Sequence, residues 1–162
     1  MDALARLPCP DVPIKDATRW RPYADDGDTT PFEGDALLHT DWKPDNVLIE
    51  PAAVRVVDWS WPTRAAAWID PACFLVQLIA NGHTPAEADR WAMGTRAWRA
   101  APPAAVDAFA RATVRLWDEI ADATPRRGTG ARPMRRTHGP RRDADRAQPG
   151  SLGATAAASV VA

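Results

Sequence analysis

The spacing of apolar and polar positions predicts short strands before residue 60 and helices after it. Three brief apolar runs, at 36–38, 47–49 and 54–57, are separated by polar segments. Their length and their β-branched residues favour strands over helices. We therefore expect a short strand at 36–38 and a hairpin in which 47–49 and 54–57 pair across the turn at 50–53. The polar segment 39–46 then forms a loop beside the hairpin.

Beyond Pro62 the apolar spacing becomes helical. Asp70 is a typical N-cap residue and Pro71 a typical first helical residue, and the apolar run that follows them stops at Asn81-Gly82. This pattern predicts a helix between Asp70 and Asn81. Because the run is apolar on nearly every side, we expect the helix to be buried.

Two more helices are expected further along the chain. The segment 84–87 is a capping box with a proline in the first turn, and it predicts a helix through about Trp98. Pro102-Pro103 starts a third helix. Its residues at helical spacing predict one buried face, formed by Val106, Phe109, Thr113, Leu116 and Ile120.

The ends of the chain differ from this middle part. Prolines punctuate the start, so we expect the first dozen residues to be extended and a short helix to follow within 15–24. Periodicity disappears after Thr124, and the Arg-, Pro- and Ala-rich composition of 125–162 predicts disorder. At 162 residues and 46% hydrophobic content the chain has room for one domain with a core. The expected organisation is an N-terminal segment 1–33, a folded domain 34–124 and a disordered tail.

Charge separates the tail from the body. Residues 125–162 hold eight Arg against two Asp, a net +6, so the chain total of −1 leaves −7 for residues 1–124. A basic arm can bind nucleic acid through phosphates, but this tail has no aromatic residue to stack on bases, which argues against nucleic-acid binding. A further hypothesis is that the tail arose by a reading-frame change in a GC-rich gene, which resequencing of independent isolates would test.

The sequence shows no sign of a membrane or of secretion. The apolar stretches are too short to span a bilayer, and residues 1–6 lack the basic start and the apolar run of a signal peptide. We therefore expect a cytoplasmic protein with no membrane partner.

The polar loop carries the candidate chemistry. Asp41 and Asn46 lie in the loop and Asp58 follows the second strand of the expected hairpin, so the three side chains can meet at one end of it. Carboxylate and amide oxygens are hard ligands that suit Mg²⁺, an ion that also keeps waters and substrate phosphates. These residues predict a metal-assisted phosphate site. The rival interpretation is that Asp41 and Asn46 are turn residues, because both types bond their own backbone in loops.

The same residues carry a family resemblance. His39-x-Asp41-x-x-x-x-Asn46 resembles the catalytic loop of the protein-kinase-like fold, and the segment 56–59 resembles the metal-binding strand end that follows it. Trp59 in place of phenylalanine resembles the aminoglycoside phosphotransferase and choline-kinase-like branch. The resemblance covers roughly residues 34–100. It implies an α+β fold, the mainly α-helical C-lobe of a protein-kinase-like fold with a short β-hairpin that carries the catalytic loop.

The resemblance assigns a role to each residue of the loop. It makes Asp41 the carboxylate that takes the proton of the acceptor hydroxyl, and it makes Asn46 and Asp58 the ligands of Mg²⁺. It places His39 under the loop, where the imidazole fixes the loop's shape. It places Lys43 beside the transferred phosphate of ATP, as a catalytic and ATP-binding residue.

The sequence departs from the family pattern at several positions. Thr40 stands where the small-molecule branch usually has glycine. Phe74 stands where the family often has an acidic residue that braces the catalytic loop, so either Asp70 takes over this structural task or the brace is missing. Only 38 residues precede His39, they contain no glycine-rich loop, and Lys15 has no strand-like context, so the N-lobe of the fold is expected to be absent.

The function implied by the resemblance is transfer of the γ-phosphate of ATP to a hydroxyl of a small molecule. One alternative is a non-catalytic remnant of the lobe that serves as an interaction module, and another is a nucleic-acid binder that uses the Arg-rich tail. An apolar surface left where the N-lobe would dock favours self-association.

Overall fold

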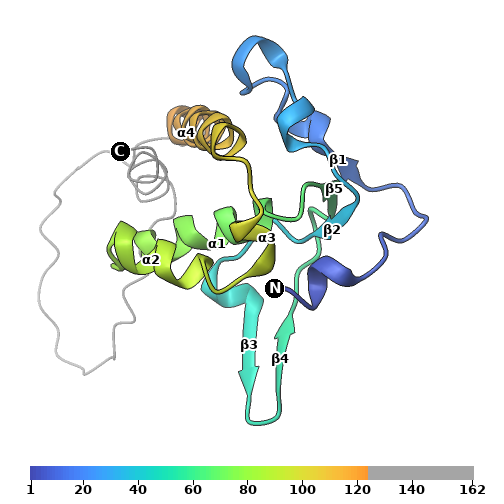
Figure 1. Cartoon of the computed structure of the whole chain (residues 1–162), viewed down its shortest axis with the longest axis vertical. Helices are drawn as coiled ribbons and strands as arrows, with labels where there is room; N and C mark the ends of the chain where they lie inside the picture. Colours follow the sequence, from blue (N-terminus) through green and yellow to red (C-terminus); the bar gives the residue numbers. More distant parts are fainter. Residues whose placement is uncertain (124–162) are drawn as a thin grey trace, which may run out of the picture.

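The computed structural model describes residues 1–123, which form a mixed α+β fold (Figure 1). The strands are β1 (Lys15–Asp16), β2 (Ala36–Leu38), β3 (Val47–Glu50), β4 (Ala53–Val56) and β5 (Thr63–Ala65). The helices are α1 (Ile69–Ala80), α2 (Pro85–Ala92), α3 (Arg96–Arg99) and α4 (Pro103–Ala123). The expected α+β class is confirmed for this part of the chain.

One small sheet joins the N-terminal segment to the rest of the fold. β5 lies between β1, which runs parallel to it, and β2, which runs antiparallel. The sequence predicted neither β1 nor β5, and the interpretation of Lys15 as a residue outside any strand was wrong, because Lys15 pairs with Thr63. Strands of two or three residues are too short to show a period, and these form because distant segments supply their partners.

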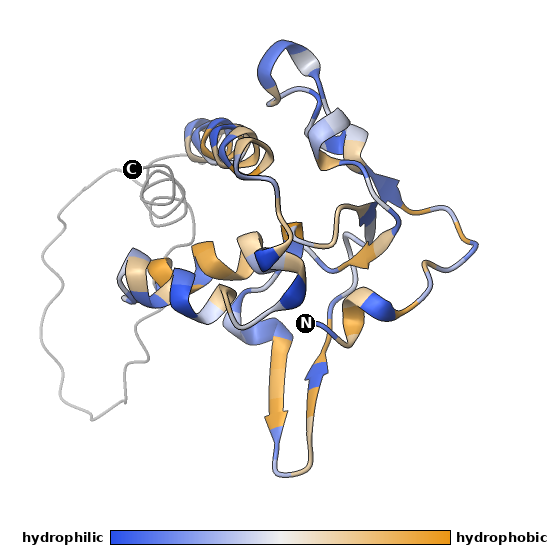
Figure 2. Cartoon of the chain, in the orientation of Figure 1, coloured by the Kyte–Doolittle hydropathy of each residue, from blue (hydrophilic) through white to orange (hydrophobic). Residues whose placement is uncertain are grey.

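The predicted hairpin is confirmed as β3 and β4. The two strands pair antiparallel, with Val47 opposite Val56 and Glu50 opposite Ala53. The hairpin projects from the body (Figure 1), and β3 is apolar along most of its length (Figure 2). Because its strands pair only with each other, the hairpin is ordered by its own ladder and by contacts at its base.

Helix α1 is the predicted helix, with a different start. It begins at Ile69 with Trp68 at the N-cap position, so the expectation of Asp70 as N-cap was wrong. The Asp70 carboxylate instead accepts hydrogen bonds from backbone N–H groups of the polar loop, which compete with those of its own helix. The end is as predicted, because Gly82 follows with a φ of 97°, a left-handed conformation that glycine adopts without strain.

The region expected to form one helix through Trp98 contains two. The capping box is present, because the Thr84 hydroxyl accepts from the Glu87 N–H and the Glu87 carboxylate accepts from the Thr84 N–H. The helix nevertheless ends at Ala92, so the longer helix was wrong. The Thr95 hydroxyl donates to the Ala92 carbonyl and accepts from the Trp98 N–H, which ends α2 and caps α3.

Helix α4 turns a slightly different face to the core than predicted. Ala105, Phe109 and Ala112 are buried, at positions one and two turns apart. Of the predicted face only Phe109 is fully buried, while Ile120 near the far end is 38% exposed. The small alanine side chains on either side of Phe109 let the helix backbone approach the core closely.

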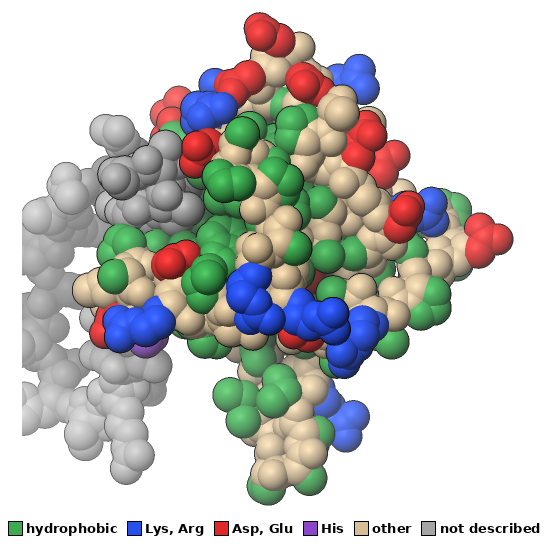
Figure 3. Space-filling model, in the orientation of Figure 1, with side chains coloured by type: hydrophobic (Ala, Val, Ile, Leu, Met, Phe, Trp, Pro, Cys, Tyr) green, Lys and Arg blue, Asp and Glu red, His purple; other side chains and the backbone are tan. Residues whose placement is uncertain are grey.

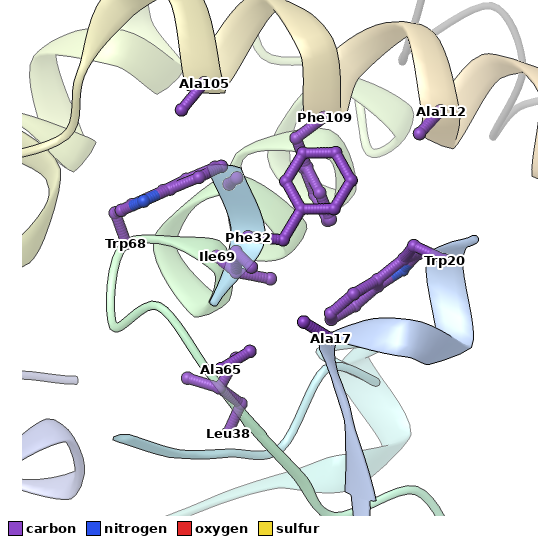
Figure 4. Packing of buried hydrophobic residues seen from close by; sticks show 11 residues of the cluster. Ala17, Trp20, Phe32, Leu38, Ala65, Trp68, Ile69, Ala105, Phe109 and Ala112 are labelled. Atoms are coloured by element: carbon purple, nitrogen blue, oxygen red, sulfur yellow. The ribbon is translucent and has the colours of Figure 1, made fainter. Parts of the chain in front are cut away.

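Aromatic rings from three parts of the chain meet in the core (Figure 4). Phe109 makes edge-to-face contacts with Trp20, Phe32 and Trp68, at ring-centroid distances of 5.3, 5.5 and 5.6 Å. Such pairs stabilise a fold beyond the burial of their area. Trp20 and Phe32 belong to the predicted N-terminal segment 1–33, so this segment packs into the same core as the rest of the described chain.

The local structure of the N-terminal segment also differs from expectation. A 3-10 turn at Leu4–Arg6 interrupts the part expected to be extended. The short helix expected within 15–24 is a 3-10 helix at Ala17–Trp20, and β1 directly precedes it. The Asp16 carboxylate caps this turn by accepting from the Thr18 N–H, which is local bonding that competes with a regular helix.

Charged side chains divide the face of the molecule seen in Figure 3. Carboxylates gather at its upper end, and Lys and Arg side chains form a row across its middle. None of the helices within residues 1–123 is both long and apolar enough to cross a bilayer. The predicted disordered tail and its nucleic-acid alternative lie outside the described residues and stay predictions.

Candidate functional site

His39 lies fully buried beneath the polar loop and links the loop to the hairpin. Its Nδ1 accepts a hydrogen bond from the Asp41 N–H at 3.3 Å, and its Nε2 lies 2.9 Å from the carbonyl oxygen of Val57. Because Nδ1 is an acceptor, Nε2 carries the proton and donates to Val57. The ring of Trp59 packs edge-to-face on His39, with centroids 4.7 Å apart. One imidazole therefore sets the position of the loop relative to the strand end that precedes Asp58.

Asp70 holds the start of the loop from helix α1. Its buried carboxylate accepts hydrogen bonds from the N–H groups of His39 at 3.0 Å and Thr40 at 2.9 Å. Burial raises the pKa of Asp70 above its ordinary value of 3.8, and these two bonds oppose that rise. The buried indole N–H of Trp42 lies near the same carboxyl, but outside hydrogen-bond geometry. Asp70 is thus a brace that acts on the loop backbone.

Asp41 and Asn46 are in direct contact. The Asn46 side-chain amide donates to the Asp41 carbonyl oxygen at 2.9 Å and to the Asp41 carboxylate at 3.0 Å. Asn46 ends the 3-10 turn Pro44–Asn46, and its own carbonyl accepts from the Val57 N–H at 3.0 Å. Because the amide nitrogen faces Asp41, the amide oxygen of Asn46 points away from that carboxylate.

Lys43 lies between two carboxylates. Its Nζ is 2.9 Å from Asp41 Oδ2 and 3.9 Å from Asp58 Oδ2. The hydrogen bond to Asp41 raises the pKa of Lys43 above its ordinary value of 10.5, and the charge of Asp58 adds to the rise. Ser60 donates a short hydrogen bond to the other carboxylate oxygen of Asp58. The structure therefore brings Asp41, Asn46, Lys43 and Asp58 together, with the charged groups open to solvent.

Two residues at this site have a left-handed backbone. The φ angle is 65° at Thr40 and 61° at Asp58. For a residue with a Cβ this conformation costs on the order of 1–2 kcal/mol, and it persists only where the surrounding structure holds it. Thr40 is also β-branched, which makes the conformation more unusual. The angle gives a physical reason why glycine suits this position.

The donor set at the loop fits a magnesium ion in chemical type. Asp58, Asp41 and the amide oxygen of Asn46 are hard oxygen donors, and Mg²⁺ needs few protein ligands beside water and phosphate. Within residues 1–123 no group of three or more His, Cys, Asp or Glu side chains is placed to hold a metal. Asp41 and Asp58 supply only two side chains of these types, and the Asn46 amide is not one of them. The ammonium of Lys43 contacts both carboxylates, so a metal ion at this site would share them with it.

Aromatic side chains form a wall behind the loop. Trp42 contacts Phe74 of α1 with centroids 5.9 Å apart, and Phe74 contacts Trp91 of α2 at 4.4 Å. Phe74 therefore packs between the two tryptophan rings. The bracing hydrogen bonds come from Asp70, one helical turn earlier.

Sequence reasoning missed a cation that reaches the loop from the N-terminal segment. Arg19 Nη1 donates to Thr40 Oγ1 at 3.0 Å and to Thr63 Oγ1 at 2.7 Å. These partners are 21 and 44 residues away along the chain, and no local pattern connects them. One signal was available in the sequence. Thr40 is a β-branched residue where the resemblance implies glycine, so its backbone conformation needs support from another side chain.

Comparison of the chain with protein-family models, with curated proteins and with solved structures finds no match. The family resemblance of residues 39–59 is thus a prediction from their types and spacing, and the function must be argued from the site itself.

Proposed function

We propose that this chain carries the catalytic loop of an ATP-dependent phosphotransferase of the aminoglycoside phosphotransferase and choline-kinase-like type, built on a protein-kinase-like C-lobe. The acceptor in this proposal is a hydroxyl group of a small molecule. The supporting observation is the contact of Asp41 with Asn46, together with Lys43, whose ammonium lies within 4 Å of both Asp41 and Asp58. Phosphoryl transfer needs a positioned proton acceptor and groups that neutralise phosphate charge, and these side chains are of the required types.

Each residue has one role in this proposal. Asp41 takes the proton of the acceptor hydroxyl as that oxygen bonds to the γ-phosphorus of ATP and the bond to the ADP oxygen breaks. Lys43 contacts the transferred phosphate. Asn46 and Asp58 would hold Mg²⁺, which neutralises phosphate charge when it is bound. His39 and Asp70 keep the loop in shape. Since the reaction consumes ATP, we place it in the cytoplasm.

Nucleotide binding tests this proposal directly. Isothermal titration of the full chain with ATP and Mg²⁺ together should give a binding heat with a Kd between about 1 μM and 1 mM, the usual range for enzyme substrates. ADP release should rise when small molecules bearing hydroxyl groups are added. No nucleotide heat at millimolar ATP would contradict the proposal.

Asp41→Asn and Asp45→Asn form a matched pair of variants. Both remove one negative charge from the same loop, but Asp41 contacts Asn46 and Lys43, whereas Asp45 is exposed. Loss of the proton acceptor should lower turnover by about 10²- to 10⁴-fold in Asp41→Asn. Asp45→Asn should keep near-normal turnover. Equal turnover in the two variants would remove Asp41 from the mechanism.

One observation favours a second candidate, a non-catalytic interaction module. Lys43 forms ion pairs with both Asp41 and Asp58, and Asn46 hydrogen-bonds to Asp41, so these side chains have polar partners without any substrate. Under this alternative Asp41→Asn lowers the melting temperature modestly and ATP turnover is absent from the start. The titration with ATP and Mg²⁺ therefore separates the two candidates.

A further inference from the structure

Thr40 is the residue of the loop whose conformation most needs support. Its φ of 65° places a β-branched side chain in the left-handed region, directly before Asp41. A return to ordinary backbone angles at this residue would rotate the peptide that carries Asp41. The direction of the Asp41 carboxylate therefore depends on what holds Thr40.

The Thr40 backbone and the Thr40 side chain have different partners. The N–H donates to Asp70 Oδ1 at 2.9 Å, and that bond fixes the nitrogen of Thr40. The Thr40 hydroxyl accepts from Arg19 Nη1 at 3.0 Å and donates to the carbonyl oxygen of Trp61 at 3.3 Å.

Arg19 is itself fixed in place by its surroundings. Its guanidinium carbon lies 5.1 Å from the ring centre of Trp20 and 5.2 Å from that of Trp61, on which Lys15 Nζ also lies at 4.4 Å. Nη1 also donates to Thr63 Oγ1 at 2.7 Å. Two aromatic rings and a strand hydroxyl therefore hold the guanidinium at a defined point beside Thr40.

The Arg19 guanidinium is partly buried without an acidic partner among the described residues. Within residues 1–123 no carboxylate lies at ion-pair distance from Arg19, and its hydrogen bonds go to neutral hydroxyl and carbonyl oxygens. Burial lowers the pKa of Arg19 below its ordinary value of 12.5. Burial of a cation without an acidic partner costs free energy, which the hydrogen bonds and the two aromatic rings around Arg19 offset in part.

We propose that Arg19 is a positioning residue of the candidate site, which holds Thr40 Oγ1 so that the left-handed backbone of Thr40 fixes the direction of the Asp41 carboxylate. Arg19 acts through Thr40 and touches no substrate. The inference rests on the proposed function for its ligand-binding readout, and on the backbone of the loop alone for its structural readout.

The test is a double-mutant cycle between Arg19 and Thr40. Arg19→Ala should speed amide hydrogen exchange at Thr40 and Asp41 by about tenfold, because the loop then samples open states more often. It should weaken binding of ATP with Mg²⁺ by about tenfold. Arg21→Ala, which removes a neighbouring exposed arginine, should change neither.

Thr40→Gly supplies the discriminating background. Glycine adopts the left-handed conformation without strain and has no hydroxyl for Arg19 to hold. In that background Arg19→Ala should change loop exchange and ligand binding by less than about twofold. The same roughly tenfold loss in both backgrounds would show that Arg19 is only a core residue, and it would overturn the proposal.

Two further measurements cover the remaining outcomes. If Arg19→Ala does not fold, Arg19→Lys, which keeps the charge but loses the planar group, should give an intermediate rise in exchange at Thr40 and Asp41 that Thr40→Gly abolishes. Unchanged exchange in Arg19→Lys would count against the proposal. If the unmodified chain binds no ATP with Mg²⁺, the proposed function fails, and the exchange cycle still decides the role of Arg19.

Discussion

The aromatic core around Phe109 and the β3–β4 hairpin use apolar side chains in opposite ways. In the core, Phe32 and Phe109 are 0% and 5% exposed, whereas in the hairpin Ile49 and Val54 are 82% and 65% exposed. The main stabilisation from apolar side chains grows with the apolar area that they remove from water. The order of the hairpin therefore depends on its own hydrogen-bond ladder and on contacts with the body at its base. Ile49 and Val54 remain exposed to solvent.

The largest expected effect is in the core. Phe109→Ala should lower the free energy of unfolding by about 3–5 kcal/mol, because it removes the ring that Trp20, Phe32 and Trp68 contact and leaves a cavity. Urea unfolding measures the change. The matched hairpin variant Ile49→Ala should change it by less than about 0.5 kcal/mol. Similar losses in the two variants would abolish the contrast between core and hairpin.

The next effect lies where the body meets the loop. Asp70→Ala should cost about 2–4 kcal/mol, because the buried N–H groups of His39 and Thr40 lose their acceptor. Asp118→Ala, which removes an exposed carboxylate on α4, should stay within about 0.5 kcal/mol in the same urea assay. A loss for Asp70→Ala no larger than this control would mean that the loop needs no brace from α1.

A charge placed on the hairpin should change self-association of the chain and leave its free energy of unfolding nearly unchanged. Ile49→Lys should leave the free energy of unfolding within about 0.5 kcal/mol, because the side chain is exposed already. A charge on a strand edge opposes pairing with another chain, so sedimentation velocity at high concentration should shift toward the monomer. Val12→Lys charges an apolar residue that is 54% exposed away from the hairpin, and it should leave sedimentation unchanged.

The smallest expected effect is on the melting temperature, through the exposed ion pairs of Asp25, whose contribution depends on pH. The hydrogen bonds from Arg115 and Arg111 hold the pKa of Asp25 below its ordinary value of 3.8. A lowered pKa stabilises the fold above that ordinary value, and the contribution is lost as the pH falls through the lowered pKa. Asp25→Asn should therefore melt slightly below the unmodified chain at about pH 7, with the gap closing as the pH falls below 3.8.

Asp26→Asn is the control for this pH dependence, since it changes the exposed neighbouring residue. Its melting temperature should follow that of the unmodified chain at each pH. A gap for Asp25→Asn that persists in acid would show that the ion pairs to α4 do not cause it.

The parts of the fold that the sequence predicted have strong local signals. The hairpin was predictable because β-branched runs flank a short turn, and the capping box at Thr84 because its two hydrogen bonds need residues at a fixed spacing. β1 and β5 were not predictable, since Lys15 and Thr63 become strand residues only through each other. The division between α2 and α3 depends on the Thr95 hydroxyl, whose choice between helix and cap is decided by packing.

The candidate site divides in the same way. Asp41 and Asn46 lie in one loop and Asp58 lies one hairpin later, so their meeting follows from the connection alone. Arg19 could not be predicted, because its contact with Thr40 depends on how the N-terminal segment packs onto the sheet. Asp70 was predicted as a cap and as a brace, and only its distance to the loop backbone distinguishes the two roles.

Under the proposed function, Lys43 affects which ions could bind beside Asp41 and Asp58. The chain supplies its own counter-ion, an ammonium tethered between Asp41 and Asp58. A monovalent ion that displaced it would bring no greater charge and would lose the advantage of the tether. A divalent ion doubles the charge that faces the same oxygens, and Coulomb attraction grows in proportion. Under the proposed function, the tethered lysine would therefore favour a divalent over a monovalent ion at these oxygens.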